Sequence, residues 1–268
     1  MRRPGSFVRV TMVVVALALV GGSVGWVRYQ QQLRNEHTTL ALVWFQTSAE
    51  CRALYYQAFN TARRVLDEYL VSHKPSKKPA VIVDIDDTIL DDSPHSVMLL
   101  KENQAFPYRY DEWIEAAKEE PLPGALGFLK YAASRGVDIF YVSNRVAAQM
   151  SATLKNLETF GFPQAEERHV LLMGKESTKE PRRQSVSADH EVILLMGDNL
   201  NDLSNVFENK SVAERFSQTD KVQDQFGSRF IVLPNPVYGV WESAVYEYKS
   251  KLTDGEKDSL RKSALKSF

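Results

Sequence analysis

Short apolar runs that switch abruptly to polar residues recur along the chain. In the clearest case, the apolar stretch 80–83 is followed by five aspartates between positions 84 and 92. An uninterrupted apolar run of this kind is typical of a strand buried on both faces of a parallel sheet. Later segments of the same character are also predicted to be strands: 137–145, 169–173, 190–199 and 229–235.

Segments with helical spacing of apolar positions lie between these runs. The first, 38–71, predicts one long helix, which the turn-rich stretch 72–79 ends. Shorter helices are expected over 110–118, 125–134 and 147–160, and the last two are stopped by Gly136 and Gly161. Further along, the pattern predicts a partly helical segment at 175–187, a helical segment at 203–224 with a break near Asn209, and a polar, basic helix from Trp241 onward.

Strands that alternate with helices predict an α/β fold with a Rossmann-like parallel sheet, helices on both faces and right-handed crossovers. In such sheets the ligand lies outside the carboxyl ends of the strands. Several predicted strands end in polar residues suited to a site there: Asp84 and Asp86, Ser143 and Asn144, Asp198 and Asn199.

The N-terminal pattern is different. Arg2, Arg3 and Arg9 precede a run, 10–27, that contains no charge. This pattern is typical of a secretory signal or an uncleaved signal-anchor, and a run of about 18 residues is at the short end of what spans a bilayer. Positive charge before the run predicts a cytoplasmic N-terminus and export of the rest. We expect residues 1–37 to be a membrane anchor, or a cleaved signal, with a spacer, and 38–268 to be one domain.

Composition excludes little else. Of the 268 residues, 44% are hydrophobic and 25% are charged, as in an ordinary globular protein. The net charge of -1 argues against binding to a nucleic-acid polymer. Cys51 is the single cysteine, so no intramolecular disulfide can form. The oligomeric state stays open, a homo-oligomer included.

The acidic stretch after the first strand has three possible explanations. In an extended chain, the side chains of Asp84 and Asp86 point to the same face and that of Asp87 points away. Two like charges held this close repel each other unless a cation lies between them or one carboxyl group keeps its proton. A solvated acidic turn is the simplest explanation. A calcium loop is excluded, because Ile89 and His95 occupy the positions that require Gly and Glu. The third is phosphoryl transfer, with Asp84 as nucleophile and Asp86 as acid and base.

Phosphoryl transfer also needs hydrogen-bond donors around the phosphate and a metal ion. Ser143 and Asn144 are candidate donors, and either Lys175 or Lys179 is a candidate cation. Asp198 and Asp202 can complete an oxygen-rich magnesium site. For Asp202, a role as a helix N-cap explains the sequence equally well.

Four motifs in order resemble the set of the haloacid-dehalogenase-like (HAD-like) phosphohydrolases: D-I-D-D-T at 84–88, S-N-R at 143–145, S-T-K at 177–179 and G-D-N-L-N-D at 197–202. More narrowly, residues 40–246 resemble the class C acid phosphatases, the exported bacterial 5′-nucleotidase lipoprotein family. This narrower resemblance depends on W-F-Q-T-S-A-E-C-R-A-L at 44–54, L-D-D-S-P at 90–94, Y-V-S-N-R at 141–145 and P-N-P-V-Y-G-V-W at 234–241.

The resemblance implies a HAD core with small helical cap elements and a phosphomonoesterase activity. It implies that Asp84 attacks phosphorus, and that Asp86 protonates the leaving group and then activates water. Ser143 and Lys179 are implied to bind the phosphoryl group, with Lys179 preferred over Lys175 because it keeps the Ser-x-Lys frame. Mg²⁺ is implied to bind the Asp84 carboxylate, the Asp86 main-chain oxygen and Asp198.

The resemblance also implies that aromatic side chains stack on the base of a nucleoside monophosphate, which gives broad nucleotide specificity. Tyr238 matches such a position well and Trp113 less closely, although a position in the core or at the rim explains Tyr238 equally well. Two departures from the family are visible. No cysteine lies directly after the hydrophobic run to carry a lipid, and Asp92 stands where many relatives have Asn.

Two other functions are compatible with the same fold. One is a non-catalytic exported protein for binding or storage, although the intact Asp84 and Asp86 count against it. The other is a phosphotransferase of the same superfamily, which the expected export from the cytoplasm disfavours.

Overall fold

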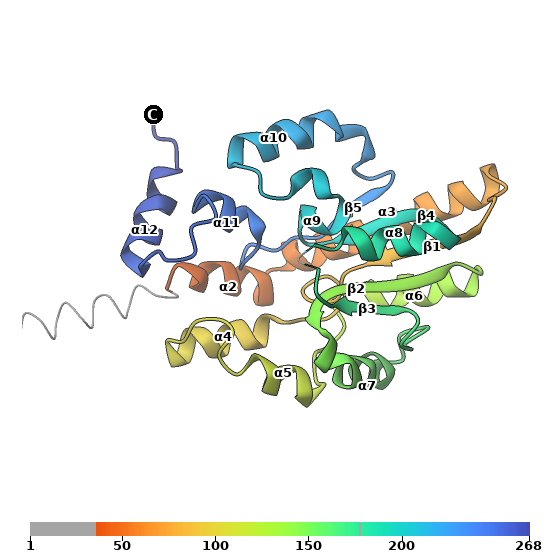
Figure 1. Ribbon diagram of the computed structural model, residues 1–268, viewed down its shortest axis with the longest axis horizontal. Helices are drawn as coiled ribbons and strands as arrows, with labels where there is room; N and C mark the ends of the chain where they lie inside the picture. The colour runs from red at the N-terminus through yellow and green to blue at the C-terminus, as the bar shows by residue number, and fades with distance from the viewer. Residues whose placement is uncertain (1–35, 177) are drawn as a thin grey trace, which may run out of the picture.

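A five-stranded, wholly parallel sheet organises the chain in the computed structural model, which describes residues 36–176 and 178–268 (Figure 1). The strand order is β3-β2-β1-β4-β5. The strands are β1 (Lys78–Val83), β2 (Asp138–Val146), β3 (Val170–Met173), β4 (His190–Gly197) and β5 (Phe230–Val232). Each lies where an apolar run predicted it, so the α/β, Rossmann-like parallel sheet is confirmed.

Helices connect the strands. Before β1 come η1 (Glu36–Thr38), α2 (Thr39–Thr47) and α3 (Ala49–Ser72). Between β1 and β3 come α4 (Ser93–Glu102), α5 (Tyr110–Ala116), α6 (Ala125–Ser134), η2 (Ala147–Gln149) and α7 (Met150–Phe160). The remainder are α8 (Glu180–Asp189), α9 (Leu200–Leu203), η3 (Asn205–Phe207), α10 (Val212–Lys221), η4 (Gln223–Gln225), α11 (Val240–Val245) and α12 (Asp254–Ser263). The short helices α4 and α5 lie beyond the sheet edge as the expected cap elements (Figure 1).

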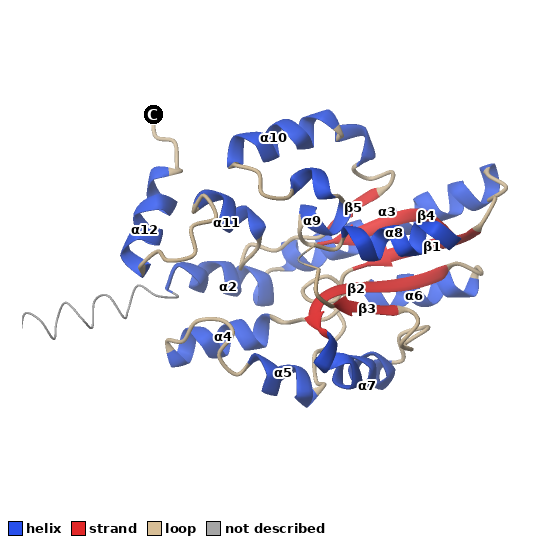
Figure 2. Ribbon diagram, viewed as in Figure 1, coloured by secondary structure: helices blue, strands red, loops and turns tan. Residues whose placement is uncertain are grey.

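The central strand β1 divides the core into two layers, because successive side chains of a strand point to opposite faces. Val81 and Val83 are buried in the larger layer, together with side chains of α3 and α6. Ala80 and Ile82 are buried in the smaller layer, which includes Val186 of α8. Helices therefore cover both faces of the sheet, as expected (Figure 2). Each large apolar side chain buried here contributes about 1.5–3 kcal/mol to folding.

The predicted single helix over 38–71 is wrong, because the chain breaks at Ser48 between α2 and α3. Ser48 has extended backbone dihedrals, and its hydroxyl accepts a hydrogen bond from the Cys51 N–H at 3.0 Å, which caps the start of α3. The expected continuous C-terminal helix is also interrupted. Glu247 and Tyr248 adopt positive φ between α11 and α12, and a helix cannot continue through such residues.

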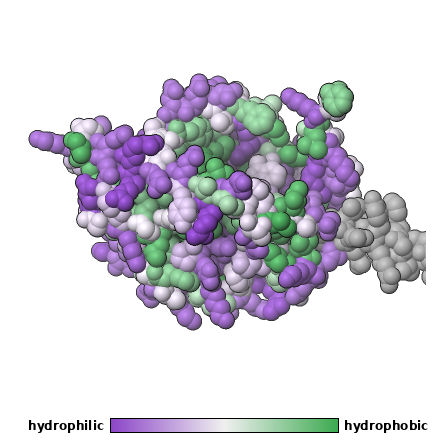
Figure 3. All heavy atoms as spheres, turned by 180° about the vertical axis from the view of Figure 1, so that it is seen from behind, coloured by the Kyte–Doolittle hydropathy of each residue, from purple (hydrophilic) through white to green (hydrophobic). Residues whose placement is uncertain are grey.

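The predicted anchor at 10–27 lies outside the described residues, and the boundary at 37/38 stays a prediction. Within residues 36–176 and 178–268, no helix is long and apolar enough to cross a bilayer. Seen from behind, hydrophilic side chains form most of the outline and hydrophobic ones appear in small groups between them (Figure 3). This mixture is ordinary for the surface of a folded domain.

The strand order places a topological switch point beside β1. From β1 the chain first builds outward through β2 and β3, and it then returns to add β4 and β5 on the other side. Ligands of open α/β sheets bind at such a point, outside the carboxyl ends of the strands. The residues that directly follow β1 and β4 are Asp84 and Asp198.

Candidate active site

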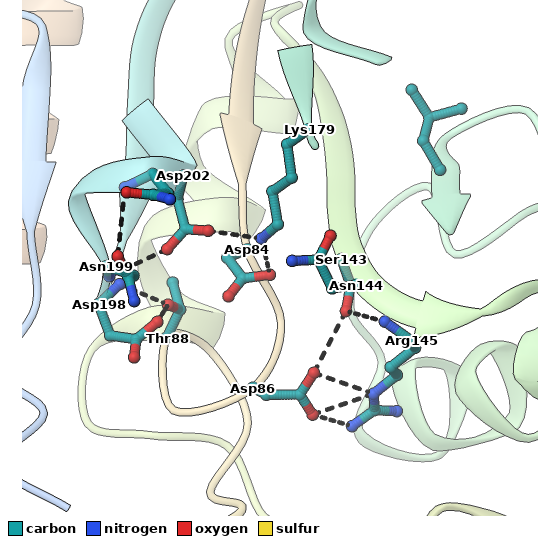
Figure 4. Close-up of polar contacts among 12 residues, drawn as sticks. Asp84, Asp86, Thr88, Ser143, Asn144, Arg145, Lys179, Asp198, Asn199 and Asp202 are labelled. Carbon is teal, nitrogen blue, oxygen red and sulfur yellow. Dashed lines mark hydrogen bonds and ion pairs between the residues drawn. The ribbon is translucent and has the colours of Figure 1, made fainter. Parts of the chain in front are cut away.

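Asp84 and Lys179 form a buried ion pair at the carboxyl end of β1 (Figure 4). Lys179 Nζ lies 2.5 Å from Asp84 Oδ1 and 2.7 Å from Asp202 Oδ1. The Lys179 residue is 4% exposed, whereas Lys175 lies on the surface. Lys179, the residue just before α8, is therefore the lysine that the fold brings to Asp84, and its role in phosphate binding stays a prediction.

The charges of this pair depend on each other. Burial raises the pKa of Asp84 well above its usual value, and the ammonium group of Lys179 only partly opposes that shift. Burial alone would lower the pKa of Lys179, but the carboxylates of Asp202 and Asp84 raise it instead. The lysine therefore stays charged, at a position where it can receive the negative oxygens of a phosphate.

Asp86 faces a different cation. Arg145 Nη2 donates to its Oδ1 at 2.7 Å, the Ser143 hydroxyl donates to its Oδ2 at 3.2 Å, and the Tyr110 hydroxyl is 3.4 Å from Oδ1. Burial would raise the pKa of Asp86, but Arg145 outweighs that effect and the pKa is lowered. Asp86 is therefore a carboxylate held by three donors, and the predicted role of Ser143 in phosphate binding stays a prediction.

Asp198 is held from two sides at the end of β4. Its Oδ1 accepts a hydrogen bond from the Thr88 hydroxyl at 3.3 Å, and its Oδ2 accepts one from Asn235 Nδ2 at 2.8 Å. Burial, together with the charges of Asp202 and Asp87, raises the pKa of Asp198 to about 8. A cation bound beside Asp198 would oppose these effects and favour the charged form of the carboxyl group.

Three of these carboxylates can share a metal ion. Asp84, Asp198 and Asp202 each offer one oxygen, and these oxygens lie within 4.8 Å of one another. Oxygen ligands of this kind suit Mg²⁺. The side chain of Asp86 belongs to a second acidic group with Asp92 and Glu119. Of the predicted ligands, Asp84 and Asp198 are therefore brought together, while the role of the Asp86 main-chain oxygen stays a prediction.

Asp202 is not the N-cap of a helix, so that explanation of its sequence position is wrong. Asn199 is the N-cap of α9, and Asp202 is three residues further on, where its Oδ2 accepts from the Asn199 N–H at 2.9 Å. Its other oxygen pairs with Lys179. A β-carbon at position 197 would collide with the Asp202 side chain, which explains the glycine before Asp198.

Asn144 is oriented by an arginine. Its Oδ1 accepts from Arg182 Nη2 at 2.8 Å, and because arginine can only donate, the amide NH₂ must point elsewhere. Figure 4 shows this nitrogen turned toward Asp84 and Lys179. Asn144, Lys179 and Asp202 line a cavity of about 170 Å³. The predicted role of Asn144 as a donor to phosphate is compatible with this geometry.

The two predicted stacking residues are both half-buried beside the acidic loop. Trp113 Nε1 donates to Asp92 Oδ1 at 2.7 Å. The hydroxyl of Tyr238 lies near the carboxylate of Asp87 and opposes the rise that burial causes in the pKa of that group. The hydrogen bond that Trp113 donates to Asp92 fixes the polar edge of that ring, and stacking on a base stays a prediction for both residues.

Sequence reasoning missed several residues of the site. Arg145 was visible as the third residue of the S-N-R motif, but the motif gave no reason to pair it with Asp86. Asn235 bridges Asp198 and Asp87, with distances of 2.8 and 3.3 Å. The only signal for Asn235 was its place in the P-N-P segment after the last strand. Glu119, which pairs with Arg145, had no signal in the sequence at all.

The raised pKa of Asp198 predicts how the stability of the metal-free protein depends on pH. An unfolded aspartate has a pKa of about 4, so between about pH 4 and pH 8 the folded state binds a proton that the unfolded state has lost. Stability then falls as pH rises through this window. Burial raises the pKa of Asp84, Asp87 and Asp92 as well, which adds to the trend.

We therefore expect the melting temperature of chelator-treated protein to fall between about pH 5 and pH 8, and Asp198→Asn to flatten this decline. Thermal unfolding at a series of pH values measures both. A melting temperature that rises across the same window in the wild-type protein would contradict the expectation.

Known proteins with the same features identify the family. The sequence model of the family described as "HAD superfamily, subfamily IIIB (Acid phosphatase)" matches residues 16–241. The class C acid phosphatase from Bacillus anthracis is 46% identical, with a TM-score of 0.85 over 88% of this chain and 99% of that chain. The structure of the Bacillus anthracis enzyme with tungstate bound matches at 47% identity, with the same TM-score and coverage. The chain therefore belongs to the HAD superfamily, subfamily IIIB acid phosphatases, and is a phosphomonoesterase.

Proposed function

We propose that this protein hydrolyses nucleoside monophosphates with the help of Mg²⁺, through an aspartyl-phosphate formed on Asp84. The observation that carries the proposal is the arrangement around Asp84. Lys179 contacts this carboxylate directly at 2.5 Å, and the residue two positions on, Asp86, is held by Arg145 and Ser143. A nucleophile, a proton carrier and phosphate-binding donors are the parts that this reaction requires.

In the first step, an oxygen of Asp84 attacks phosphorus and the bond to the leaving oxygen breaks. Lys179 and the amide of Asn144 receive the equatorial oxygens, where charge gathers in the transition state. Asp86 gives its proton to the leaving oxygen, which departs as an alcohol. Asp86 must first take up that proton, and a phosphate anion beside it favours the uptake because like charges raise the pKa of a carboxyl group.

In the second step, Asp86 has become the carboxylate seen in the structure and can act as a base. It takes a proton from a water molecule, whose oxygen attacks the phosphorus of the aspartyl-phosphate. The bond to Asp84 breaks and inorganic phosphate is released. Arg145 and Ser143 hold the carboxylate for this step, with donor distances of 2.7 and 3.2 Å.

The residues present fit a magnesium ion. Asp84, Asp198 and Asp202 converge. Asp202 already pairs with the ammonium group of Lys179, whereas the partners of Asp198 are the neutral donors Thr88 and Asn235, which makes Asp198 the better ligand of these two. Several carboxylates here face one lysine, so the site has an excess of negative charge that a divalent cation would balance. When bound, Mg²⁺ would supply positive charge to both the nucleophile and the phosphate oxygens.

Two observations support the substrate class. The Bacillus anthracis relative has been solved with tungstate bound, and tungstate is a tetrahedral oxyanion similar in shape to phosphate. Tyr238 and Trp113 are half-buried aromatic residues whose polar edges lie at Asp87 and Asp92, in the loop that carries Asp84 and Asp86. Rings held in this way lose little entropy when a base stacks on them.

The assay that tests the proposal is phosphate release from a panel of nucleoside monophosphates and simple phosphate esters, with and without chelator. We expect chelation to lower the rate at least about 100-fold and Mg²⁺ to restore it. Asn235→Ala should raise the Mg²⁺ concentration for half-maximal rate by about 10- to 100-fold, because Asn235 orients Asp198. A rate unaffected by exhaustive chelation would rule out the metal.

A ring substitution tests base stacking. Tyr238→Ala should raise KM for a nucleoside monophosphate by about 10-fold or more, and KM for a small alkyl phosphate by much less, because stacking contributes about 1–3 kcal/mol per base. Tyr238→Phe is the control, since it keeps the ring and removes only the hydroxyl near Asp87. Equal changes in KM for both substrates in Tyr238→Ala would exclude the stacking role.

We also propose that the enzyme works outside the cytoplasm, held to the membrane by its N-terminal segment or secreted after cleavage. The support is the sequence alone: arginines before the charge-free run 10–27. Fractionation of cells that express the full chain, with assay of phosphate release by intact cells, tests this.

A further inference from the structure

A buried network of charged groups connects the cap to Asp86. The guanidinium of Arg145 donates through Nη2 and Nε to Asp86 Oδ1 at 2.7 and 3.0 Å, and Nη2 also donates to Glu119 Oε2. Its Nη1 lies 3.3 Å from the Thr153 hydroxyl. The loop after β1, the segment between α5 and α6, and helix α7 therefore meet at one guanidinium.

Glu119 is fixed more firmly than an ordinary loop residue. Its side chain is 1% exposed. Its N–H donates to Asn156 Oδ1 at 3.0 Å and its C=O accepts from Asn156 Nδ2 at 2.9 Å, so α7 holds the backbone on both sides. The fold therefore holds both members of the ion pair, Glu119 and Arg145, in place, whereas side chains on the surface are flexible.

This carboxylate is costly to bury. Burial of a charged group is unfavourable unless the group is paired and fully hydrogen-bonded. Arg145 supplies a partner for Oε2, but Oε1 has no hydrogen-bond partner among the described residues. A glutamate in this position does not maximise stability, so a functional reason for it is expected.

We propose that Glu119 is a positioning residue for Asp86: it fixes the guanidinium of Arg145, which in turn holds the Asp86 carboxyl at the leaving oxygen of the substrate. The proposal rests on the role of Asp86 as proton donor in the proposed function. Among the described residues, the carboxylates that pair with Arg145 are Asp86 and Glu119. Without the charge of Glu119, the guanidinium is drawn toward Asp86 alone and both groups shift.

Such a shift has a characteristic kinetic effect. A misplacement of about 1 Å can cost about 100-fold in rate. Here the loss depends on the leaving group, because an alkoxide needs a proton to depart whereas p-nitrophenolate departs without one. A general structural disturbance would instead slow both kinds of substrate equally.

The experiment compares kcat/KM for p-nitrophenyl phosphate and for β-glycerophosphate, a simple alkyl phosphate, in Glu119→Gln. We expect a loss of about 10- to 100-fold with β-glycerophosphate and less than about 3-fold with p-nitrophenyl phosphate, in line with the usual contribution of a general acid. Glu119→Asp keeps the charge on a shorter side chain and should restore part of the loss. Glu120→Gln is the matched control, because Glu120 is the exposed neighbour.

Asp86→Asn is the benchmark that separates this proposal from the proposed function. Suppose that the loss of kcat/KM in Asp86→Asn depends on the leaving group. If Glu119→Gln then loses activity equally on both substrates, or loses none, the positioning role is overturned and the proposed function stands. If Asp86→Asn itself shows no dependence on the leaving group, the role of Asp86 fails and the positioning role fails with it. Should Glu119→Gln not fold, the same comparison is made with Glu119→Asp, for which an equal loss on both substrates is again the contrary result.

Discussion

Replacing Asp84 with asparagine should lower phosphate release at least about 10⁴-fold, the size of effect seen when a catalytic nucleophile is removed. A neutral amide oxygen is a poor nucleophile, so the aspartyl-phosphate does not form. The rate is measured with p-nitrophenyl phosphate, whose good leaving group makes the assay insensitive to the proton donor. Turnover within about 10-fold of the wild-type rate would remove Asp84 as the nucleophile.

The Asp84→Asn protein should stay folded, which makes the kinetic result interpretable. Lys179 keeps its second partner, because its Nζ also lies 2.7 Å from Asp202 Oδ1. Burial already disfavours the charged form of Asp84, so a neutral side chain of the same size is tolerated there. Asp91→Asn is the matched control from the same loop. Its Oδ1 accepts from the Ser93 N–H at 2.9 Å, which an asparagine oxygen can also do, and activity should be unchanged.

The features that could be predicted from the sequence share a physical reason. Buried parallel strands need long apolar runs, so β1 and β4 stand out from the chain, and the polar residues that follow them fall at one edge of the sheet. Asp84 and Asp198 were predicted in this way. The pattern of the chain alone could not choose between Lys179 and Lys175 as the candidate cation. The choice of Lys179 needed the S-T-K motif as well.

The features that could not be predicted depend on contacts between segments far apart in the sequence. Arg145 and Glu119 are separated by 26 positions. Arg145 lies near the end of β2 and Glu119 in the segment between α5 and α6, so no single periodic pattern relates the two. Asn235 reaches Asp87 across 148 positions. The break at Ser48 was missed for the opposite reason: a local hydrogen bond to the Cys51 N–H interrupts a helix whose apolar spacing continues across the break.

A second large effect is expected at Lys179, where one substitution should reduce both stability and activity. Lys179→Met leaves the buried carboxylates of Asp84 and Asp202 without their shared cation. Breaking one side of a buried ion pair costs about 3–5 kcal/mol, because the charge left behind is unpaired. The cost should be smaller at low pH, where the carboxyl groups take up protons instead. Thermal unfolding of chelator-treated protein at two pH values measures this.

The loss of activity in Lys179→Met should be about 100- to 1,000-fold in kcat, since a charged donor to the transferring phosphoryl group is removed. Saturating Mg²⁺ should recover part of the lost stability, because a cation that binds only the folded state stabilises it and can balance the same two carboxylates. It should not recover the rate, because the metal does not replace the lysine at the phosphate oxygens. Lys175→Met is the control: this lysine is exposed, and its loss should change stability by less than about 0.5 kcal/mol. If Lys175→Met lost activity and Lys179→Met kept it, Lys179 would have no part in phosphate binding, and its burial between two carboxylates would serve the fold alone.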